Sequence, residues 1–358
     1  MDSERPRVAI VIPTLNEERA LGRLLADLRS QRDVELEILI SDGESHDGTL
    51  RVCEDFAGCS PHPIRWVRTR AGRGRQLNAG AGATHSPDLL FLHADTEIEG
   101  PLFLARAAER LERERAGRAS HRVAGHFGLS FRRTTDRNDF AYRFFEAKTR
   151  LNRPGCVNGD QGFWLSRTYF EELRGFDESL PFLEDSQLAS RVFATGVWIT
   201  LPGRLFTSDR RFAAEGFGRR HLLNVLIRAF EVVDPSFFRQ AAGLYERHDR
   251  AERLDLRPFF ELAHRIMRGG KLSQTAANWY RVGAYTRTQA WQIAFALDCL
   301  INRRRRMPPA EGQYPCLAGF DSWFDRLTDN LGGRIFAGLL ALIWFYGTLA
   351  SLRARHAV

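Results

Sequence analysis

Short apolar runs alternate with amphipathic segments through the first hundred residues. Four of the runs have the length and composition of strands buried on both faces: residues 7–13, 36–40, 64–67 and 88–92. The stretches between them predict helices, most clearly at the leucine stripe from Leu21 to Leu28 and at residues 49–57. This alternation predicts an α/β fold with a mainly parallel sheet and helices on both faces.

The pattern changes after Val123. The next elements expected are a strand, a helix, a strand, two helices and a strand, at residues 125–131, 140–151, near 163, 167–173, 185–195 and 198–201. From about residue 249 the pattern is mostly helical, with helices expected at 257–267, 286–301 and 321–331. We therefore expect an α/β domain over residues 1–248 and a C-terminal helical extension over 249–358.

Charge separates these two regions. The chain has 52 basic and 44 acidic side chains, a net charge of +8. Residues 1–248 hold 36 basic and 35 acidic side chains, whereas residues 249–358 hold 16 and 9. A nucleic-acid-binding protein is not expected to be basic in its tail alone, so we predict no nucleic-acid partner and look for an anionic partner at the extension.

Cysteine usage and the N-terminus bear on location. The five cysteines are scattered and show no zinc-binding spacing. The first residues lead into a strand without the apolar segment of a signal peptide. We therefore expect reduced thiols and a cytoplasmic protein.

Polar side chains follow each of the first four strands. In open α/β sheets, ligands bind outside the carboxyl ends of strands. The residues found there are Thr14, Asn16, Glu17, Asp42, Arg73, Asn78, His93 and Asp95. Taken alone, Asp42 could simply cap the next helix, but four polar strand ends together favour a binding site. The glycine-rich signatures of dinucleotide sites and P-loops are absent from the sequence, so a divalent cation and arginines would have to hold any phosphate.

Six segments in order resemble the family 2 glycosyltransferases, which have the GT-A fold. They are VAIVIPTLNEE at 8–18, SDGESHDGT at 41–49, GRGRQLNAG at 72–80, LHADT at 92–96, GDQGF at 159–163 and LED at 183–185. The resemblance covers about residues 7–245. His93 stands where many members have the first aspartate of a metal-binding DxD motif, although a bacterial subgroup also resembles LHADT.

The resemblance implies a role for each matching position. A nucleotide-sugar pocket would include Pro13, Thr14, Asn16, Glu17, Asp42, Arg73, Asn78 and Ala94. Asp95 would hold Mg²⁺ or Mn²⁺ on the diphosphate, with His93 as either a weak second ligand or a sugar contact. Asp185 would be the catalytic base, positioned by Glu184 or by the helix that it opens. Gly159, Asp160 and Gln161 would bind the acceptor. Arg210 and Arg211, which follow the predicted strand at 198–201, would fold over the diphosphate.

Several of these residues also have a structural explanation. His93 could be a satisfied histidine at a strand end, and Asp185 could cap the helix it opens. Arg210 and Arg211 could be a solvated charge pair. Trp164, next to the GDQGF segment, could stack on a sugar or belong to the core.

Near the C-terminus, residues 335–352 form an uncharged apolar run between Arg334 and Arg353. Its length is at the short end for a transmembrane helix, which needs roughly 17 to 25 residues. Three alternatives stay open: a spanning helix, a helix in the membrane interface, and a helix buried in the protein or in a dimer. A single span would place Arg353 outside the cell, against the positive-inside tendency. Beside a basic stretch at 303–306, the run also suits attachment to an anionic membrane surface.

These features together predict an inverting, metal-dependent glycosyltransferase at the cytoplasmic membrane face. Its partners would be a nucleoside diphosphate sugar and a hydroxyl acceptor, of which a lipid-linked molecule is one candidate. One alternative is a nucleotidyltransferase, although residues 13–18 lack the glycine-rich, lysine-bearing loop that such an enzyme needs. The other is a non-catalytic, membrane-associated sugar-nucleotide binding protein.

Overall fold

The computed structural model describes residues 5–133, 137–234, 236–248 and 254–354. The chain forms two compact units. Unit 1 comprises Met1–Arg133 and Phe145–Ser208, and unit 2 comprises Thr134–Phe144 and Asp209–Val358. The boundary expected after residue 248 borders residues outside the described part and stays a prediction.

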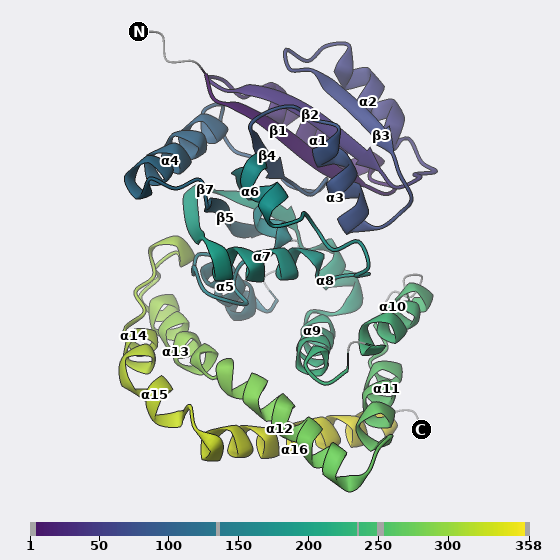
Figure 1. Ribbon diagram of the computed structural model, residues 1–358, viewed down its shortest axis with the longest axis vertical. Helices are drawn as coiled ribbons and strands as arrows, with labels where there is room; N and C mark the ends of the chain where they lie inside the picture. Colours follow the sequence, from purple (N-terminus) through teal and green to yellow (C-terminus); the bar gives the residue numbers. More distant parts are fainter. Residues whose placement is uncertain (1–4, 134–136, 235, 249–253, 355–358) are drawn as a thin grey trace. The chain divides into compact units, whose positions relative to one another are not determined.

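Unit 1 is built on a seven-stranded sheet with the order β3-β2-β1-β4-β6-β5-β7 (Figure 1). The strands are β1 Arg7–Thr14, β2 Glu35–Asp42, β3 Ile64–Arg68, β4 Asp88–Phe91, β5 Val123–Arg132, β6 Phe163–Ser166 and β7 Val197–Ser208. β1 to β4 are mutually parallel, and β5 is parallel to β7. Only β6 runs antiparallel to its two neighbours, among the strands that the structure describes.

Helices cover both faces of this sheet because side chains alternate along each strand. Val8, Ile10 and Ile12 of β1 enter one core, and Ala9 and Val11 enter the other. The first core includes side chains of α1 Glu18–Arg29, α2 Thr49–Ala57 and α4 Phe103–Arg118. The second includes side chains of α3 Arg73–Gly82, α6 Arg167–Glu172 and α7 Glu184–Thr195. Trp164 is fully buried in the first core.

Unit 2 is helical in its described residues, and α5 Asp139–Lys148 belongs partly to each unit. Its helices are α8 Arg210–Glu215, α9 Phe217–Glu231, α10 Ser236–His248, α11 Arg257–Arg268, α12 Leu272–Thr288, α13 Trp291–Arg304, α14 Pro315–Gly319, α15 Asp325–Thr328 and α16 Leu331–Ala354. Short 3-10 turns occur at Gly159–Gln161 in unit 1 and Pro309–Glu311 in unit 2, and a π-helical turn at Phe320–Phe324 leads into α15. The predicted α/β fold, with a mainly parallel sheet, helices on both faces and a C-terminal helical extension, is therefore confirmed.

Two helix predictions in the extension had the wrong bounds. The helix expected at 286–301 is the end of α12 and most of α13, which are separated at residues 289–290. The helix expected at 321–331 is a π-helical turn, a single turn of α15 and the start of α16. The sequence prediction missed most of α12. Contact with α16 helps to hold this helix in place: Gly283 of α12 lies against the backbone of Gly338 in α16, where no larger side chain would fit.

Candidate active site

The first group of predicted site residues lies at the adjacent carboxyl ends of β1 and β2. Thr14 and Asp42 are paired in the parallel register, and both are buried. Asp42 accepts hydrogen bonds from Thr14 Oγ1 at 3.3 Å and from the Ser45 N–H at 3.1 Å. Gln76 of α3 donates to the carbonyl oxygens of Thr14 (2.7 Å) and Ser41 (2.9 Å). These contacts hold the two strand ends and the start of α3 together.

The loops that follow β1 and β2 are also bonded to one another. The Asn16 N–H donates to Ser45 Oγ, and the Asn16 side chain accepts from the His46 N–H, both at 2.9 Å. The Glu17 N–H donates to Thr49 Oγ1 at 2.9 Å. Asn16 has a positive φ of 57°, which asparagine tolerates better than most residues. The predicted nucleoside side of the site thus has a preformed rim.

A second group is centred on Asp185, at the start of α7. The Gly159 N–H donates to Asp185 Oδ2 at 2.7 Å, and the Ser186 N–H donates to Oδ1 at 2.6 Å. A Cβ at position 159 would lie 3.2 Å from Asp185 and 3.3 Å from His93 Nε2. Leu183, just before α7, has a φ of 67°, a conformation that a leucine adopts only when its surroundings enforce it. The fold therefore presents the Asp185 carboxylate to the GDQGF segment in a fixed orientation.

Arg73 and His93 connect this group to the fourth strand end. Arg73 Nη2 lies 3.1 Å from His93 Nδ1, and the same ring nitrogen lies 2.7 Å from Asp160 Oδ1. Arg73 Nε lies 3.7 Å from Glu184 Oε1. Burial alone would lower the pKa of Arg73, but Glu184, Asp160, Asp185 and Asp95 raise it above its usual value. One cation thus faces four carboxylates.

Glu184 is the most confined of these carboxylates. Its side chain is 2% exposed, and no described residue donates a hydrogen bond to its Oε1. Burial and the neighbouring Asp185 raise the pKa of Glu184, and Arg73 only partly offsets them. A buried carboxylate without its full set of donors is costly to the fold, which is a frequent feature of functional sites.

Asp95 lies just beyond the end of β4, where Thr207 Oγ1 donates to its Oδ2 at 3.1 Å. Within the described residues, no group of three or more His, Cys, Asp or Glu side chains is arranged to hold a metal ion. Asp95 could therefore hold an ion such as Mg²⁺ together with substrate phosphates, which is the usual arrangement when only one or two protein carboxylates bind the ion.

Some predicted site residues have other contacts in the structure. Asn78 donates to the Phe176 carbonyl oxygen at 2.8 Å and accepts from the Phe176 N–H at 2.8 Å, so its side chain anchors a loop. Gln161 is buried and donates to the Cys156 carbonyl oxygen. Pro13 is half-buried and Ala94 is buried. Arg210 and Arg211 lie in α8 of unit 2. The binding roles expected for these six stay predictions.

Two residues with contacts at the site were not predicted from the sequence to belong to it. Gln76 bridges the carbonyl oxygens of Thr14 and Ser41, and Thr207 contacts Asp95. The position of Gln76, inside the quoted GRGRQLNAG segment, was the available signal. Thr207 lies more than 110 residues from Asp95 and carries no motif, so only the fold could bring the two together.

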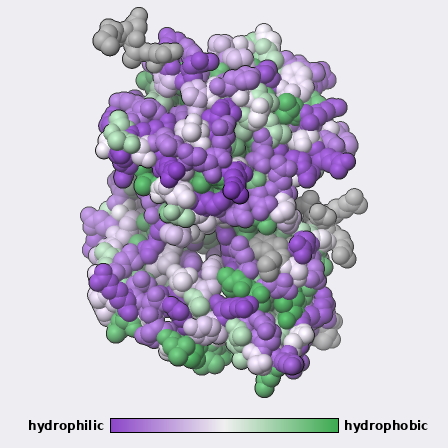
Figure 2. All heavy atoms as spheres, in the orientation of Figure 1, coloured by the Kyte–Doolittle hydropathy of each residue, from purple (hydrophilic) through white to green (hydrophobic). Residues whose placement is uncertain are grey.

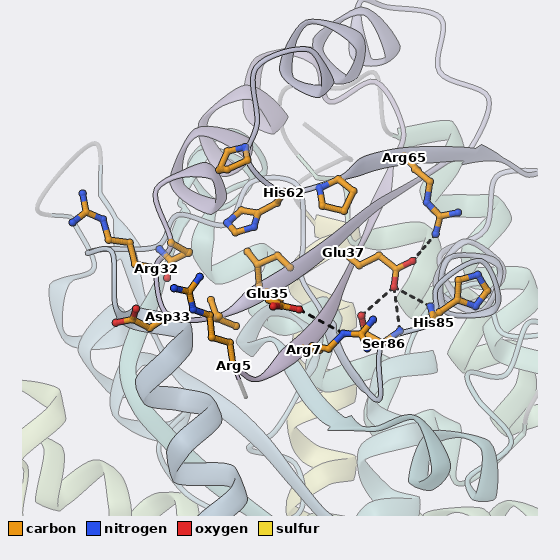
Figure 3. A pocket seen from close by; sticks show the side chains of 15 residues that line it. Arg5, Arg7, Arg32, Asp33, Glu35, Glu37, His62, Arg65, His85 and Ser86 are labelled. Atoms are coloured by element: carbon orange, nitrogen blue, oxygen red, sulfur yellow. Dashed lines mark hydrogen bonds and ion pairs between the residues drawn. The ribbon is translucent and has the colours of Figure 1, made fainter. Parts of the chain in front are cut away.

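A cleft of about 810 Å³ lies at the opposite, amino ends of β1 and β2 (Figure 3). Its lining includes Glu35, which is paired with Arg7, and Glu37, which is paired with Arg65. None of the predicted site residues lines it. We therefore place the candidate active site at the carboxyl ends of the strands, not in this cleft.

Comparison with known proteins finds a family match that covers most of the sheet in unit 1. Residues 9–174 match the family model described as glycosyl transferase family 2. The matched segment is less than half of the chain. It includes most of β1 and all of β2 to β6, and with them Asp42, Arg73, His93 and Asp95. The match supports sugar transfer as the activity.

The individual relatives are more distant. A 4,4'-diaponeurosporenoate glycosyltransferase of Staphylococcus haemolyticus is 30% identical over 94 residues, which is 25% of this chain and 24% of that protein. A mannosyltransferase from Pyrobaculum calidifontis, solved with GDP-Man and Mn²⁺, is 19% identical over 96% of this chain and 88% of its own, with a TM-score of 0.47. Residues 1–349 of S. aureus TarS are 13% identical over 84% and 92%, with a TM-score of 0.44. We draw no conclusion from the two structural likenesses, because both TM-scores are below 0.5.

Proposed function

We propose that this protein is a glycosyltransferase that moves a sugar from a nucleoside diphosphate sugar to an acceptor hydroxyl with inversion at the anomeric carbon. The observation that carries the proposal is the Asp185 carboxylate, fixed by the Gly159 and Ser186 N–H groups beside the acceptor segment. A general base must be oriented within hydrogen-bond reach of the hydroxyl it deprotonates. The family match over residues 9–174 supports the reaction class.

Asp185 takes the proton of the acceptor hydroxyl in this reaction. The acceptor oxygen forms a bond to the anomeric carbon as the bond from that carbon to the diphosphate breaks. A direct displacement of this kind inverts the anomeric centre. Gly159 leaves room beside Asp185, and Asp160, with its carboxylate near His93, lies on the acceptor side.

The donor binds at the carboxyl ends of the strands. Thr14, Asn16, Glu17 and Asp42 form the nucleoside side, because their loops are already bonded into one rim. Arg73 approaches the diphosphate, since its guanidinium is about half-exposed beside the carboxylate group. A bound diphosphate supplies Arg73 with negative oxygens that it can bind in bidentate fashion.

Asp95, with His93 as a second candidate ligand, would hold a divalent cation against the diphosphate. The cation would neutralise charge on the departing nucleoside diphosphate. Asp95 keeps one oxygen in contact with Thr207, which would orient the carboxylate for this task. The α/β domain at residues 1–248 would carry out the transfer at the cytoplasmic face of the membrane, to which the helical extension at 249–358 would attach it.

Titration calorimetry with a panel of nucleoside diphosphate sugars and Mg²⁺ or Mn²⁺ tests the donor assignment. We expect one donor to bind. Arg73→Ala should lower the affinity for that donor by about 10- to 100-fold, because one or two charge-assisted hydrogen bonds would be lost. Arg75→Ala is the matched control, because Arg75 lies on the same turn of α3 and pairs with Glu178.

The reaction products then distinguish the remaining alternatives. Release of free nucleoside diphosphate supports glycosyl transfer, whereas pyrophosphate release would identify a nucleotidyltransferase. Donor binding without turnover for any acceptor would indicate a binding protein. Equal loss of affinity in the Arg73 and Arg75 variants would contradict the proposed role of Arg73.

A further inference from the structure

Helix α16 of unit 2 has one buried side. It is the only helix in the described residues that is long and apolar enough to cross a membrane, judged by length and composition. Phe345 is buried against Phe260 of α11, with ring centroids 5.3 Å apart, and against Phe230 of α9 at 5.5 Å. Gly338 lies against Gly283 of α12. Three helices of unit 2 therefore cover this side of α16.

The other side of α16 is exposed although it is apolar. Ile335, Phe336, Leu339, Leu340 and Ile343 are between 47% and 66% exposed. Their spacing of three and four residues puts them on one face of the helix, which has no charged residue between Ile335 and Ala350. An exposed apolar stripe of this length marks an interaction site.

The segment before α16 extends the exposed apolar surface. Trp323 and Leu327 are 61% and 64% exposed, and Leu331, at the start of α16, is 64% exposed. Figure 2 shows hydrophobic side chains gathered over this part of unit 2, around α15 and α16. An exposed tryptophan at the end of an apolar stripe suits the boundary between lipid headgroups and acyl chains.

Arginines mark both ends of the stripe. Arg326 and Arg334 lie near its start, where Arg334 pairs with Asp329, and Arg353 lies near its end and pairs with Glu261. The positive excess therefore belongs to the extension as a whole. The surrounding residues 249–358 hold 16 basic and 9 acidic side chains. A second copy of the chain would bring the same positive charge to the interface, whereas an anionic lipid surface complements it.

We propose that unit 2 rests on an anionic membrane surface, with α16 lying in the plane of the interface and its exposed stripe inserted among the acyl chains. Spanning is disfavoured by the helices that cover α16. α11 carries Glu261, which pairs with Arg353 through two hydrogen bonds, and α12 carries the exposed Arg281. If α16 crossed the membrane, either these charged side chains would enter the hydrocarbon layer or α16 would lose its contacts with α9, α11 and α12. Both outcomes cost free energy. The inference refines the proposed membrane location and needs no sugar donor.

Vesicle co-sedimentation of the full chain tests the partner. We expect binding to vesicles of phosphatidylglycerol and phosphatidylcholine, much weaker binding to phosphatidylcholine alone, and loss of binding at high salt. Replacing Leu339, Leu340 and Ile343 together by glutamine should lower the affinity by about 100-fold, because inserted apolar side chains provide the anchoring. These side chains point outward, so the variant should keep its unfolding temperature.

Trp323→Gln provides a milder second variant, with an expected loss of about 10-fold. Trp66→Gln is its matched control, because Trp66 is a partly exposed tryptophan on β3 of unit 1. Vesicle binding unaffected by either α16-region variant would overturn the proposal. The proposal would also be overturned if the wild-type chain does not bind vesicles and instead forms a dimer in solution that the triple variant cannot form.

Depth measurements test the orientation. Spin labels at Phe336→Cys, Ile343→Cys and Ala350→Cys, which lie seven residues apart on one face of α16, should all report the same depth in a chain with Cys59 and Cys316 replaced by serine. A deep label at 343 between shallow labels at 336 and 350 would show a spanning helix and overturn the in-plane orientation. Donor titration of the same samples keeps the two proposals separate, since a chain that binds its sugar nucleotide but no vesicles disproves only this one.

Discussion

The two ends of the sheet in unit 1 differ in how fully they supply hydrogen-bond donors to a carboxylate. At the amino end, Glu37 accepts hydrogen bonds from the His85 and Ser86 N–H groups, from Ser86 Oγ and from Arg65. Although burial would raise the pKa of Glu37, these donors hold it below its usual value. At the carboxyl end, the pKa of Glu184 is raised, and its Oε1 accepts no hydrogen bond from any described residue.

The difference in hydrogen-bond donors suggests that Glu37 has a structural role and that Glu184 has a functional one. Glu37 has its donors within the fold and gains nothing from a ligand. Glu184, Asp185, Asp160 and Asp95 all lie near enough to Arg73 to raise its pKa. Such a group is stabilised when cations or hydrogen-bond donors arrive with a substrate, so the strain at this end of the sheet supports its proposed role in binding and chemistry.

The largest effect is expected at Asp185. Asp185→Asn keeps the shape of the side chain but removes its ability to take a proton, so turnover should fall by about 10²- to 10⁴-fold. Donor affinity should stay within a few-fold of wild type. The control is Asp177→Asn, in a surface loop where Asp177 accepts from Ser179. Steady-state rates and donor titration check both variants, and unchanged turnover in Asp185→Asn would remove the base from the mechanism.

The second prediction compares Glu37→Gln with Glu184→Gln. The amide that Glu37→Gln introduces must turn donors toward the N–H groups of His85 and Ser86, or leave them unpaired, which should cost about 1 to 3 kcal/mol in the free energy of unfolding. Glu184→Gln removes a poorly satisfied charge and should be neutral or slightly stabilising. Urea denaturation at pH 7 measures both. Equal destabilisation would show that the two ends of the sheet do not differ in the way described.

The pH dependence of stability should distinguish the same pair. A lowered carboxyl pKa stabilises the fold above about pH 4.5 and loses this contribution as the pH falls, so the deficit of Glu37→Gln should shrink below that pH. A raised pKa makes the folded protein bind its proton more tightly, so wild type should lose stability relative to Glu184→Gln as the pH rises from about 4.5. Urea midpoints measured from pH 2.5 to pH 8 check both slopes. Parallel curves for the two variants would contradict these signs.

Much of unit 1 could be predicted from sequence because its elements have strong local signals. The apolar runs at 7–13, 36–40, 64–67 and 88–92 all lie in or across strands of the sheet. The extension was less predictable. α12 depends on contact with α16 through Gly283 and Gly338, and two glycines far apart in the sequence give no periodic signal.

The candidate site divides in a similar way. Residues in motifs, such as Arg73, His93, Gly159 and Asp185, are brought together as a group. Their pairing could not be foreseen, since the contact between His93 and Asp160 joins residues 67 positions apart. A motif residue can also have a structural role. Asn78 lies in one of the matching segments, yet its side chain makes hydrogen bonds to the backbone of Phe176. Motifs locate a site, but packing decides which way each side chain points.

The smallest effect is expected at Gly159. A methyl group there would lie 3.2 Å from Asp185 and 3.3 Å from His93 Nε2, closer than ordinary contact, so Gly159→Ala should shift the carboxylate by a few tenths of an ångström. We expect turnover to fall by about 5- to 10-fold, because catalysis depends steeply on the position of the base. Gly82→Ala is the matched control, since a Cβ at Gly82 would meet nothing within 4 Å. Stability should change little in either variant. A loss of turnover shared by both, or absent from both, would show that close packing around Asp185 does not position the base.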